Sequence, residues 1–362
     1  MAKLFENNAQ KEPVITFILG NGFDLSLHMK TSYSHVYSTY VETPSSSNVI
    51  AVFKNELKNR KPFDKWSDFE IGMAEYAKSL SSEEELVECV RDFKQHMVSH
   101  LRSEDQQLER LIQGGFYNSQ LVKELDRSFE NFHGGFSPNI KAEFERLTDK
   151  EFWNYNVITF NYTKSLEYLH IAKFKQQKMI MKPPIHIHGN LYDDVVVGVD
   201  NIEQIVDTAY KLTKKGHRAF VKPIFNEQYD KNRVSKAKRM ISSSSIICTY
   251  GFSLGESDQS WVDLIVDWLK KDPDHHLVVY KYDTTEYDRC VFDELMDIED
   301  TKKEELMQRL GISDSNLENQ LHIPVGYDIF NFEFKKIEEN KLPEHFNVFD
   351  TMSDSSKSFS YK

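Results

Sequence analysis

The first strongly apolar run of the chain, Val14 to Leu19, ends in the sequence Gly20-Asn21-Gly22-Phe23-Asp24. A β-branched, apolar run that stops at two closely spaced glycines is typical of a buried strand that enters a tight turn. In nucleotide-binding α/β sheets, such a turn lets the backbone approach a phosphate, and the amides of the next helix face the anion. The spacing here is GxGxD and not the complete GxGxxG, so an ordinary buried strand with a glycine turn remains the alternative.

Composition indicates a globular protein with a small ligand or a protein partner. The 362 residues are 40% hydrophobic and 13% aromatic, which excludes a wholly disordered chain and allows either two domains or one α/β domain with a large insertion. The formal net charge of −12 makes a nucleic acid an unlikely partner, because broad phosphate binding requires a basic surface.

Cysteine usage and the N-terminus favour a cytoplasmic protein. Cys89, Cys248 and Cys290 are far apart and form no CxxC pair, so neither a disulfide framework nor a four-cysteine zinc site is predicted. The N-terminal segment has no apolar core of the kind found in signal peptides, and no run approaches the roughly 20 apolar residues of a membrane helix. We therefore expect no membrane association.

Strand-like and helix-like patterns alternate along most of the chain. The predicted strands after the first one are 155–160, 185–188, 195–199, 245–250 and 276–282, and helical spacing follows most of them. Such alternation predicts an α/β fold with a doubly wound parallel sheet. A parallel sheet places the carboxyl ends of its strands at one edge, where ligands bind.

Between residues 65 and 150 the apolar residues follow helical spacing, which predicts a helical insertion. We expect residues 1–64 to form the first part of the sheet domain and residues 151–350 the remainder. The Ser-rich residues 351–362 are expected to be a disordered tail. The segment Trp66 to Glu70 opens the insertion, either as an acidic first helical turn or as a contribution to the site.

Four predicted strand ends carry glycine or polar residues suited to a ligand site. These are Gly20 to Asp24, Asn161, His188 and Gly251 to Ser253. Two basic segments, Lys211 to Arg218 and Lys231 to Arg239, are predicted to be surface, or at most to flank bound phosphates.

The motifs GNGFD, TFNYT, HIHGN and YGFSLGESD, taken in this order over Val14 to Trp261, resemble the abortive-infection AbiH family of bacterial antiphage proteins. The same order of motifs is similar to that of sirtuin-like NAD-binding enzymes with a Rossmann-like fold. The resemblance implies an effector of abortive infection that hydrolyses NAD, an NAD nucleosidase that depletes the cell of NAD. Protein deacetylation is not implied, because the chain lacks the paired cysteines of the sirtuin zinc module.

The same resemblance implies roles for individual residues. Asn161 would lie at the nicotinamide ribose and His188 would be the catalytic histidine, whereas Gly251 and Ser253 would line the second half of the nucleotide site. The turn that holds NAD would consist of Gly20, Asn21, Gly22, Phe23 and Asp24.

Residue chemistry is compatible with these roles. Breaking the glycosidic bond builds positive charge on the ribose, so the site needs a group that positions hydroxyls and water, and a base that works near neutral pH. An asparagine amide both donates and accepts hydrogen bonds, and histidine titrates near pH 6.5. Alternatively, Asn161 caps a helix and His188 is a core histidine beside His186. A metal site from the two histidines lacks a third ligand, so no metal is expected.

Two other functions remain open at this stage. The pocket could serve a nucleotide-binding sensor that signals phage infection to a partner protein without turnover, or the chain could be a nuclease that acts on RNA. The expected partners are NAD and either a phage-derived trigger or a neighbouring defence protein. A homo-oligomer is also left open.

Overall fold

The computed structural model describes residues 14–59, 66–113, 118–148, 153–171, 179–181, 183–205, 208–229, 231–280 and 292–332. Within these residues, seven strands form one sheet in which all pairings are parallel. They are β1 (Ile15–Leu19), β2 (Trp153–Thr159), β3 (Met179–Met181), β4 (Ile185–His186), β5 (Ile246–Tyr250), β6 (His276–Tyr280) and β7 (Leu321–His322). The predicted α/β class with a parallel sheet is confirmed.

The strand order is β3-β2-β1-β5-β6-β7, and β4 also pairs with β2. β3 pairs with the first residues of β2, whereas β4 pairs with its last residues, so the two short strands share one edge of β2. The chain moves from β1 outward through β2, and then returns to β5 on the other side of β1. The register places Leu19 beside both Thr159 and Tyr250, so the ends of the three central strands are level.

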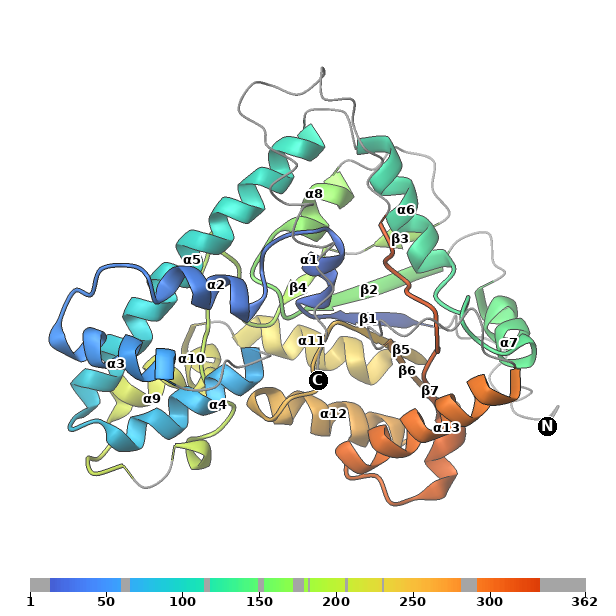
Figure 1. Cartoon of the computed structure of the whole chain (residues 1–362). Helices are drawn as coiled ribbons and strands as arrows, with labels where there is room; N and C mark the ends of the chain where they lie inside the picture. The colour runs from blue at the N-terminus through green and yellow to red at the C-terminus, as the bar shows by residue number, and fades with distance from the viewer. Residues whose placement is uncertain are drawn as a thin grey trace.

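Helices surround this sheet on both faces and also form a lobe beside it (Figure 1). The helices in the first half of the chain are α1 (Gly22–Ser26), α2 (Tyr33–Tyr40), α3 (Asn48–Asn59), α4 (Trp66–Tyr76), α5 (Glu83–Gln113), α6 (Asn118–Glu130), α7 (Pro138–Thr148) and α8 (Ser165–Ile171). Those in the second half are α9 (Lys214–Phe220), α10 (Lys222–Tyr229), α11 (Lys231–Ser243), α12 (Gln259–Leu269) and α13 (Phe292–Arg309). Short 3-10 turns are η1 (Ala77–Ser79), η2 (Ile202–Gln204), η3 (Glu256–Asp258) and η4 (Ser315–Gln320).

Alternation along the strands explains why both faces are covered. In β1, Phe17 packs into a cluster with α6, α7 and α8, whereas Ile18 packs into a second cluster with α11, α12 and α13. Successive side chains of a strand point to opposite faces, so a strand whose residues are all buried needs helices on both faces of the sheet. All five residues of β1 are buried, as expected for a central parallel strand.

The helical lobe consists of α2, α3, α4, the first part of α5, and α9, and it has its own apolar cluster. Met97 of α5 packs in this cluster, whereas Leu108 of the same helix packs against the sheet. The helices of residues 65–150 are therefore divided between the lobe and one face of the sheet. α2 and α3, which precede residue 65, belong to the lobe as well.

The predicted strand 195–199 is wrong. Val195, Val197 and Val199 are buried in the lobe cluster, and only an isolated bridge joins Val199 to Val221 within the described residues. Gly198 interrupts the run with a φ of 145° and directs its amide to Glu70. Burial by helices thus produced the same apolar signal as burial in a sheet. The predicted tail, residues 351–362, lies outside the described residues.

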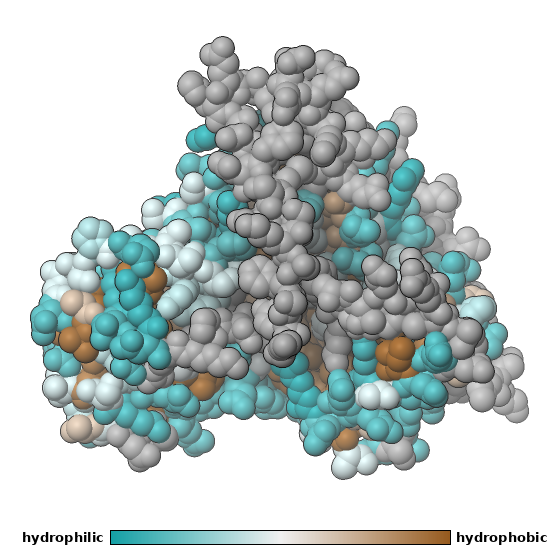
Figure 2. Space-filling model, in the orientation of Figure 1, coloured by the Kyte–Doolittle hydropathy of each residue, from teal (hydrophilic) through white to brown (hydrophobic). Residues whose placement is uncertain are grey.

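The visible face of the molecule is largely hydrophilic where the structure describes it, with small and separate apolar patches (Figure 2). The two basic segments fall mainly on α9 and α11, and most of their lysine and arginine side chains are exposed, as predicted. Within the described part of the chain, no helix is both long and apolar enough to cross a membrane.

Candidate functional site

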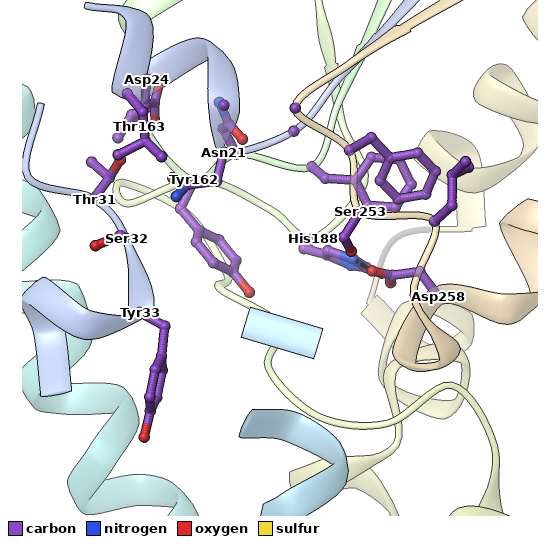
Figure 3. A pocket seen from close by; sticks show the side chains of 18 of the residues that line it. Asn21, Asp24, Thr31, Ser32, Tyr33, Tyr162, Thr163, His188, Ser253 and Asp258 are labelled. Carbon is purple, nitrogen blue, oxygen red and sulfur yellow. Dashed lines mark hydrogen bonds and ion pairs between the residues drawn. The ribbon is translucent and has the colours of Figure 1, made fainter. Parts of the chain in front are cut away.

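A cavity of about 540 Å³ lies at the carboxyl ends of β1, β2, β5 and β6, between the sheet and the helical lobe. Its volume falls within the range of about 300–1,000 Å³ that is typical of ligand pockets. The sheet side of its lining includes Gly20, Asn21, Gly22, Asp24, Asn161, His188, Gly251 and Ser253. Figure 3 shows Asn21, Tyr162, His188 and Ser253 around the same space. The structure therefore brings together eight of the nine predicted site residues.

Phe23 is the exception, because it lies in the core and not in the lining of this cavity. Its ring packs edge to face against Phe330, with the ring centroids 5.1 Å apart. The side chain is fully buried in the cluster on the α6 and α8 side of the sheet. Phe23 therefore anchors the turn, and its neighbours in sequence face the cavity.

The glycine turns after β1 and β5 pack directly against each other. A Cβ atom on Gly251 would lie 2.4 Å from the backbone of Gly22, and a Cβ on Gly20 would lie 2.4 Å from the Gly251 carbonyl oxygen. The amide of Gly22 donates to the Gly251 carbonyl at 3.4 Å, and that of Phe23 donates to the Gly20 carbonyl at 3.0 Å. The close approach of the two backbones is thus sufficient to explain why these positions are glycine, and no ligand is needed to explain it.

We expect Gly251→Ala to lower the free energy of unfolding by about 2–5 kcal/mol. Overpacking typically costs about 1–3 kcal/mol, and left-handed backbone adds about 1–2 kcal/mol for a residue other than glycine. Gly251 has a φ of 62°, and Gly311 has a similar φ of 64° but open space around its Cβ position. Gly311→Ala is therefore the matched control and should lose only the backbone part. Equal losses in urea unfolding of the two variants would contradict the packing explanation.

Asp24 is a buried acid at the floor of the turn. Its carboxylate accepts hydrogen bonds from Thr163 Oγ1 at 2.7 Å and from Ser165 Oγ at 2.8 Å. Burial raises the pKa of Asp24 to about 6, although these two hydrogen bonds act in the opposite direction. The turn after β1 and the loop after β2 are thus joined by a group that changes charge near neutral pH.

This pKa predicts a pH dependence of stability. The folded pKa of Asp24, about 6, lies above the usual value of 3.8, so folding favours the protonated acid. Its contribution is complete below the unfolded pKa and is lost as the pH rises through about 6. Between pH 5 and pH 8 the loss amounts to roughly 1–2 kcal/mol. Urea unfolding at both pH values should show a smaller loss for Asp24→Asn than for the wild type; identical losses would refute the assignment.

Asn161 follows β2, and a buried histidine, His186, contacts its backbone carbonyl group. His186 Nδ1 lies 2.8 Å from the Asn161 carbonyl oxygen, and His186 Nε2 lies 2.7 Å from Glu167 Oε1. Burial acts to lower the pKa of His186, but Glu167 outweighs it and raises that pKa above its usual value. The side chain of Asn161 lies close enough to Asp24 to act against the rise in the pKa of that acid, but its buried Nδ2 makes no hydrogen bond of full geometry with a described residue.

His188 lies just beyond β4 and faces a different partner from His186. Its Nε2 is 2.9 Å from Asp258 Oδ1, and its Nδ1 is buried with no hydrogen-bond partner in the described ranges. β4 ends at His186, so strand alternation does not apply to His188. The two histidines do not converge on one point, which gives no support to a metal site between them.

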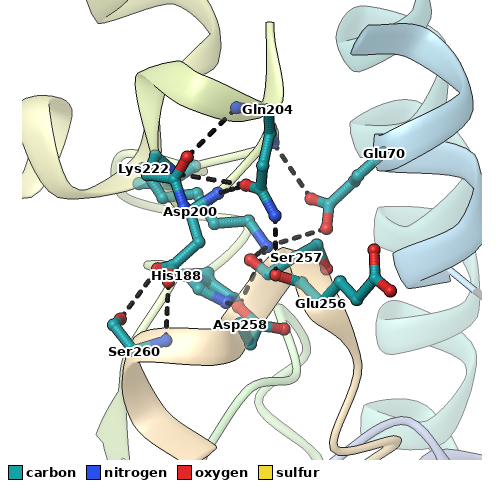
Figure 4. A network of polar contacts seen from close by, with 12 residues as sticks. Glu70, His188, Asp200, Gln204, Lys222, Glu256, Ser257, Asp258 and Ser260 are labelled. Atoms are coloured by element: carbon teal, nitrogen blue, oxygen red, sulfur yellow. Dashed lines mark hydrogen bonds and ion pairs between the residues drawn. The ribbon is translucent and has the colours of Figure 1, made fainter. Parts of the chain in front are cut away.

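Behind His188 lies a buried charge network (Figure 4). Lys222 Nζ donates to Glu70 Oε2 at 2.7 Å, to Asp258 Oδ1 at 3.0 Å and to the Ser257 carbonyl at 3.0 Å. Burial would lower the pKa of Lys222, but the two acids outweigh it and raise that pKa. Burial would likewise raise the pKa of Asp258, yet Lys222 and His188 hold it well below its usual range.

The network contains residues that sequence reasoning did not assign. The sequence allows Glu70 to be either an acid of the first helical turn or a site residue, and the structure places it in the cavity lining. Helical spacing could have favoured the site, because Met73 and Ala74, three and four residues later, are buried. No comparable signal marks Lys222, since its partners are distant in sequence.

A family model described as bacteriophage abortive infection AbiH matches residues 16–280 of the chain. The match begins in β1, ends at the last residue of β6, and includes all nine predicted site residues together with Glu70, Lys222 and Asp258. A comparison with curated proteins found no match.

Proposed function

The chain belongs to the bacteriophage abortive infection AbiH family, and on this premise we propose that it is an antiphage effector that hydrolyses NAD. Membership of the family implies a role in the abortive response to bacteriophage infection. NAD hydrolysis is the finer proposal, and the cavity at the carboxyl ends of the sheet is its assigned site.

Topology supports a nucleotide ligand. If β3 and β4 count as one position, the strand order corresponds to the 3-2-1-4-5-6 order of doubly wound dinucleotide-binding sheets. We therefore interpret the sheet as Rossmann-like. In such sheets the ligand binds beyond the carboxyl ends of the strands, where the winding reverses. Here that point lies between β1 and β5, and the two glycine turns that meet there line the cavity.

The observation that carries the proposal is a pair of buried polar atoms, of which one has no partner among the described residues and the other has only a contact with Asp24 that falls short of full hydrogen-bond geometry. Asn161 Nδ2 is a donor, His188 Nδ1 is a ring nitrogen, and both side chains line the same cavity. Buried polar atoms are nearly always hydrogen-bonded, so two such atoms at one cavity indicate groups that await a ligand. A ribose hydroxyl and a water molecule are suitable partners for them.

The proposed reaction balances with water as its other substrate. The bond between the ribose C1′ and the nicotinamide nitrogen breaks, and its electron pair leaves with nicotinamide, which becomes neutral. Water attacks C1′ and gives its proton to His188 Nδ1, yielding ADP-ribose. Asn161 holds the ribose in place, so that attack needs little further loss of orientational freedom.

Nicotinamide and ADP-ribose release from NAD tests this proposal. The purified protein is incubated with NAD, with and without phage lysate as a source of trigger, and the products are separated by chromatography. Stoichiometric release of both products supports hydrolysis. Calorimetric binding of NAD without release under either condition would refute hydrolysis and favour the nucleotide-binding sensor.

A further inference from the structure

We infer that Asp258 is a positioning residue that fixes the protonation of the His188 ring, and that Lys222, held in place by Glu70, keeps Asp258 in the ionised form that this requires. The inference rests on the proposed function of His188 as the base. It gives a role to Asp258, Lys222 and Glu70, three buried charged groups that do not themselves take part in the proton transfer.

The first step is the direction of the hydrogen bond between His188 and Asp258. An ionised carboxylate can only accept a hydrogen bond, so the proton of this 2.9 Å contact must lie on His188 Nε2. In the neutral ring the other nitrogen, Nδ1, then carries the lone pair. Nδ1 is the atom without a partner in the described ranges, so the carboxylate leaves the basic nitrogen on the unpaired side of a ring that lines the cavity.

The second step is the ionisation of Asp258. An aspartate at this depth would tend to become protonated, and a protonated acid could donate to Nε2 and move the ring proton to Nδ1. Lys222 prevents this, because its ammonium group lies 3.0 Å from the same oxygen that accepts from His188. The side chain of Lys222 is 3% exposed, so water screens the attraction little.

The third step is the role of the helical lobe. Glu70 belongs to α4, and its two carboxylate oxygens accept from Lys222 Nζ at 2.7 Å and from the amide of Gly198 at 3.0 Å. This pair fixes the position of Lys222 from the lobe side, as the dashed lines in Figure 4 show. The charge network therefore needs Glu70 from the lobe as well as Asp258, which follows the β5 turn.

Nitrogen-15 NMR of histidine side chains in the ligand-free protein tests the inference. The His188 signals among the 13 histidines are assigned by their absence from the spectrum of His188→Ala. In the wild type near pH 8 we expect a slowly exchanging, low-field proton on Nε2 and no proton on Nδ1. Asp258→Asn keeps a balanced Lys222 and Glu70 pair and should fold. Its neutral acceptor bonds more weakly, so the Nε2 proton should move upfield and a second tautomer should appear.

Glu167→Gln is the matched control, because it removes the carboxylate beside His186 and leaves Asp258 in place. Its His188 signals should remain as in the wild type. A wild-type ring that carries its proton on Nδ1, or His188 signals that are the same in Asp258→Asn, would overturn the inference.

Kinetics separate this inference from the proposed function. If the wild type hydrolyses NAD, Asp258→Asn should lower kcat by about 10²-fold, at the lower end of the usual contribution of a general base, and change KM little. The expected NMR result in a protein that never releases nicotinamide would refute the proposed function and leave the positioning role standing. Unchanged kcat in an active enzyme would overturn the positioning role alone.

Discussion

Replacing His188 with alanine is expected to lower kcat for NAD hydrolysis by about 10²- to 10⁴-fold, which is the usual contribution of a general base. The variant loses the nitrogen that accepts the proton from water, whereas the glycine turns and Asn161 remain in place. Binding of NAD, measured by calorimetry, should therefore change little. Nicotinamide release measured by chromatography on the same protein sample gives the change in turnover.

Two further variants make this prediction decisive. His217→Ala removes a histidine on α9 outside the cavity lining and should retain full turnover. His188→Gln keeps most of the side-chain volume and a donor for Asp258, so it should remain folded even if alanine leaves a destabilising hole. Turnover near the wild-type rate in His188→Gln would contradict the role of His188 as the base.

Lys222→Met is expected to lower the free energy of unfolding by about 3–5 kcal/mol, because it leaves buried acids without their counter-ion. Lys222 is the cation that contacts both Glu70 and Asp258, and all three side chains are largely buried. Methionine fills a similar volume, so the loss reports charge and not packing. Urea unfolding at pH 7 provides the measurement.

A second substitution isolates the cause of that loss. In Lys222→Met with Glu70→Gln, one orphaned acid is removed, and Asp258 still has His188 as a partner. The double variant should therefore be more stable than Lys222→Met alone, although it carries an additional change. Additive losses in the double-mutant cycle would show that Glu70 and Lys222 do not interact.

Much of the site could be predicted from the sequence because strand ends carry a local signal. The strands that contribute Gly22, Asn161 and Gly251 are short apolar runs that stop abruptly at glycine or asparagine. Parallel pairing brings the carboxyl ends of such strands together, so these three residues could be assigned to one edge of the sheet from the sequence pattern alone, and all three line the cavity.

The remaining part of the site depends on contacts that leave no local pattern. Lys222 begins α10, which is distant in the sequence from the strands on either side. Its role depends on its hydrogen bond with Glu70, which is 152 positions away in the sequence. The lobe was likewise not delimited by periodicity, because helical spacing shows that a helix has a buried face and not what covers that face. Val195 to Val199 illustrate the same ambiguity, since helices bury these valines where a strand was expected.

The glycine turns show how one sequence signal can have two causes. Their glycines are required for backbone contact between the β1 and β5 turns, so the motif alone does not establish a phosphate site. The buried Asn161 Nδ2 and His188 Nδ1 are independent of that packing. The case for a ligand therefore rests on these two side chains more than on the glycines.

A crystal structure of His188→Gln with bound NAD would test the central claim most directly, because slowed turnover leaves the substrate intact. We expect the nicotinamide ribose to lie within hydrogen-bond distance of Asn161 Nδ2, with its C1′ facing residue 188 across the cavity. NAD bound elsewhere on the protein, or bound with its adenosine end against Asn161, would contradict it.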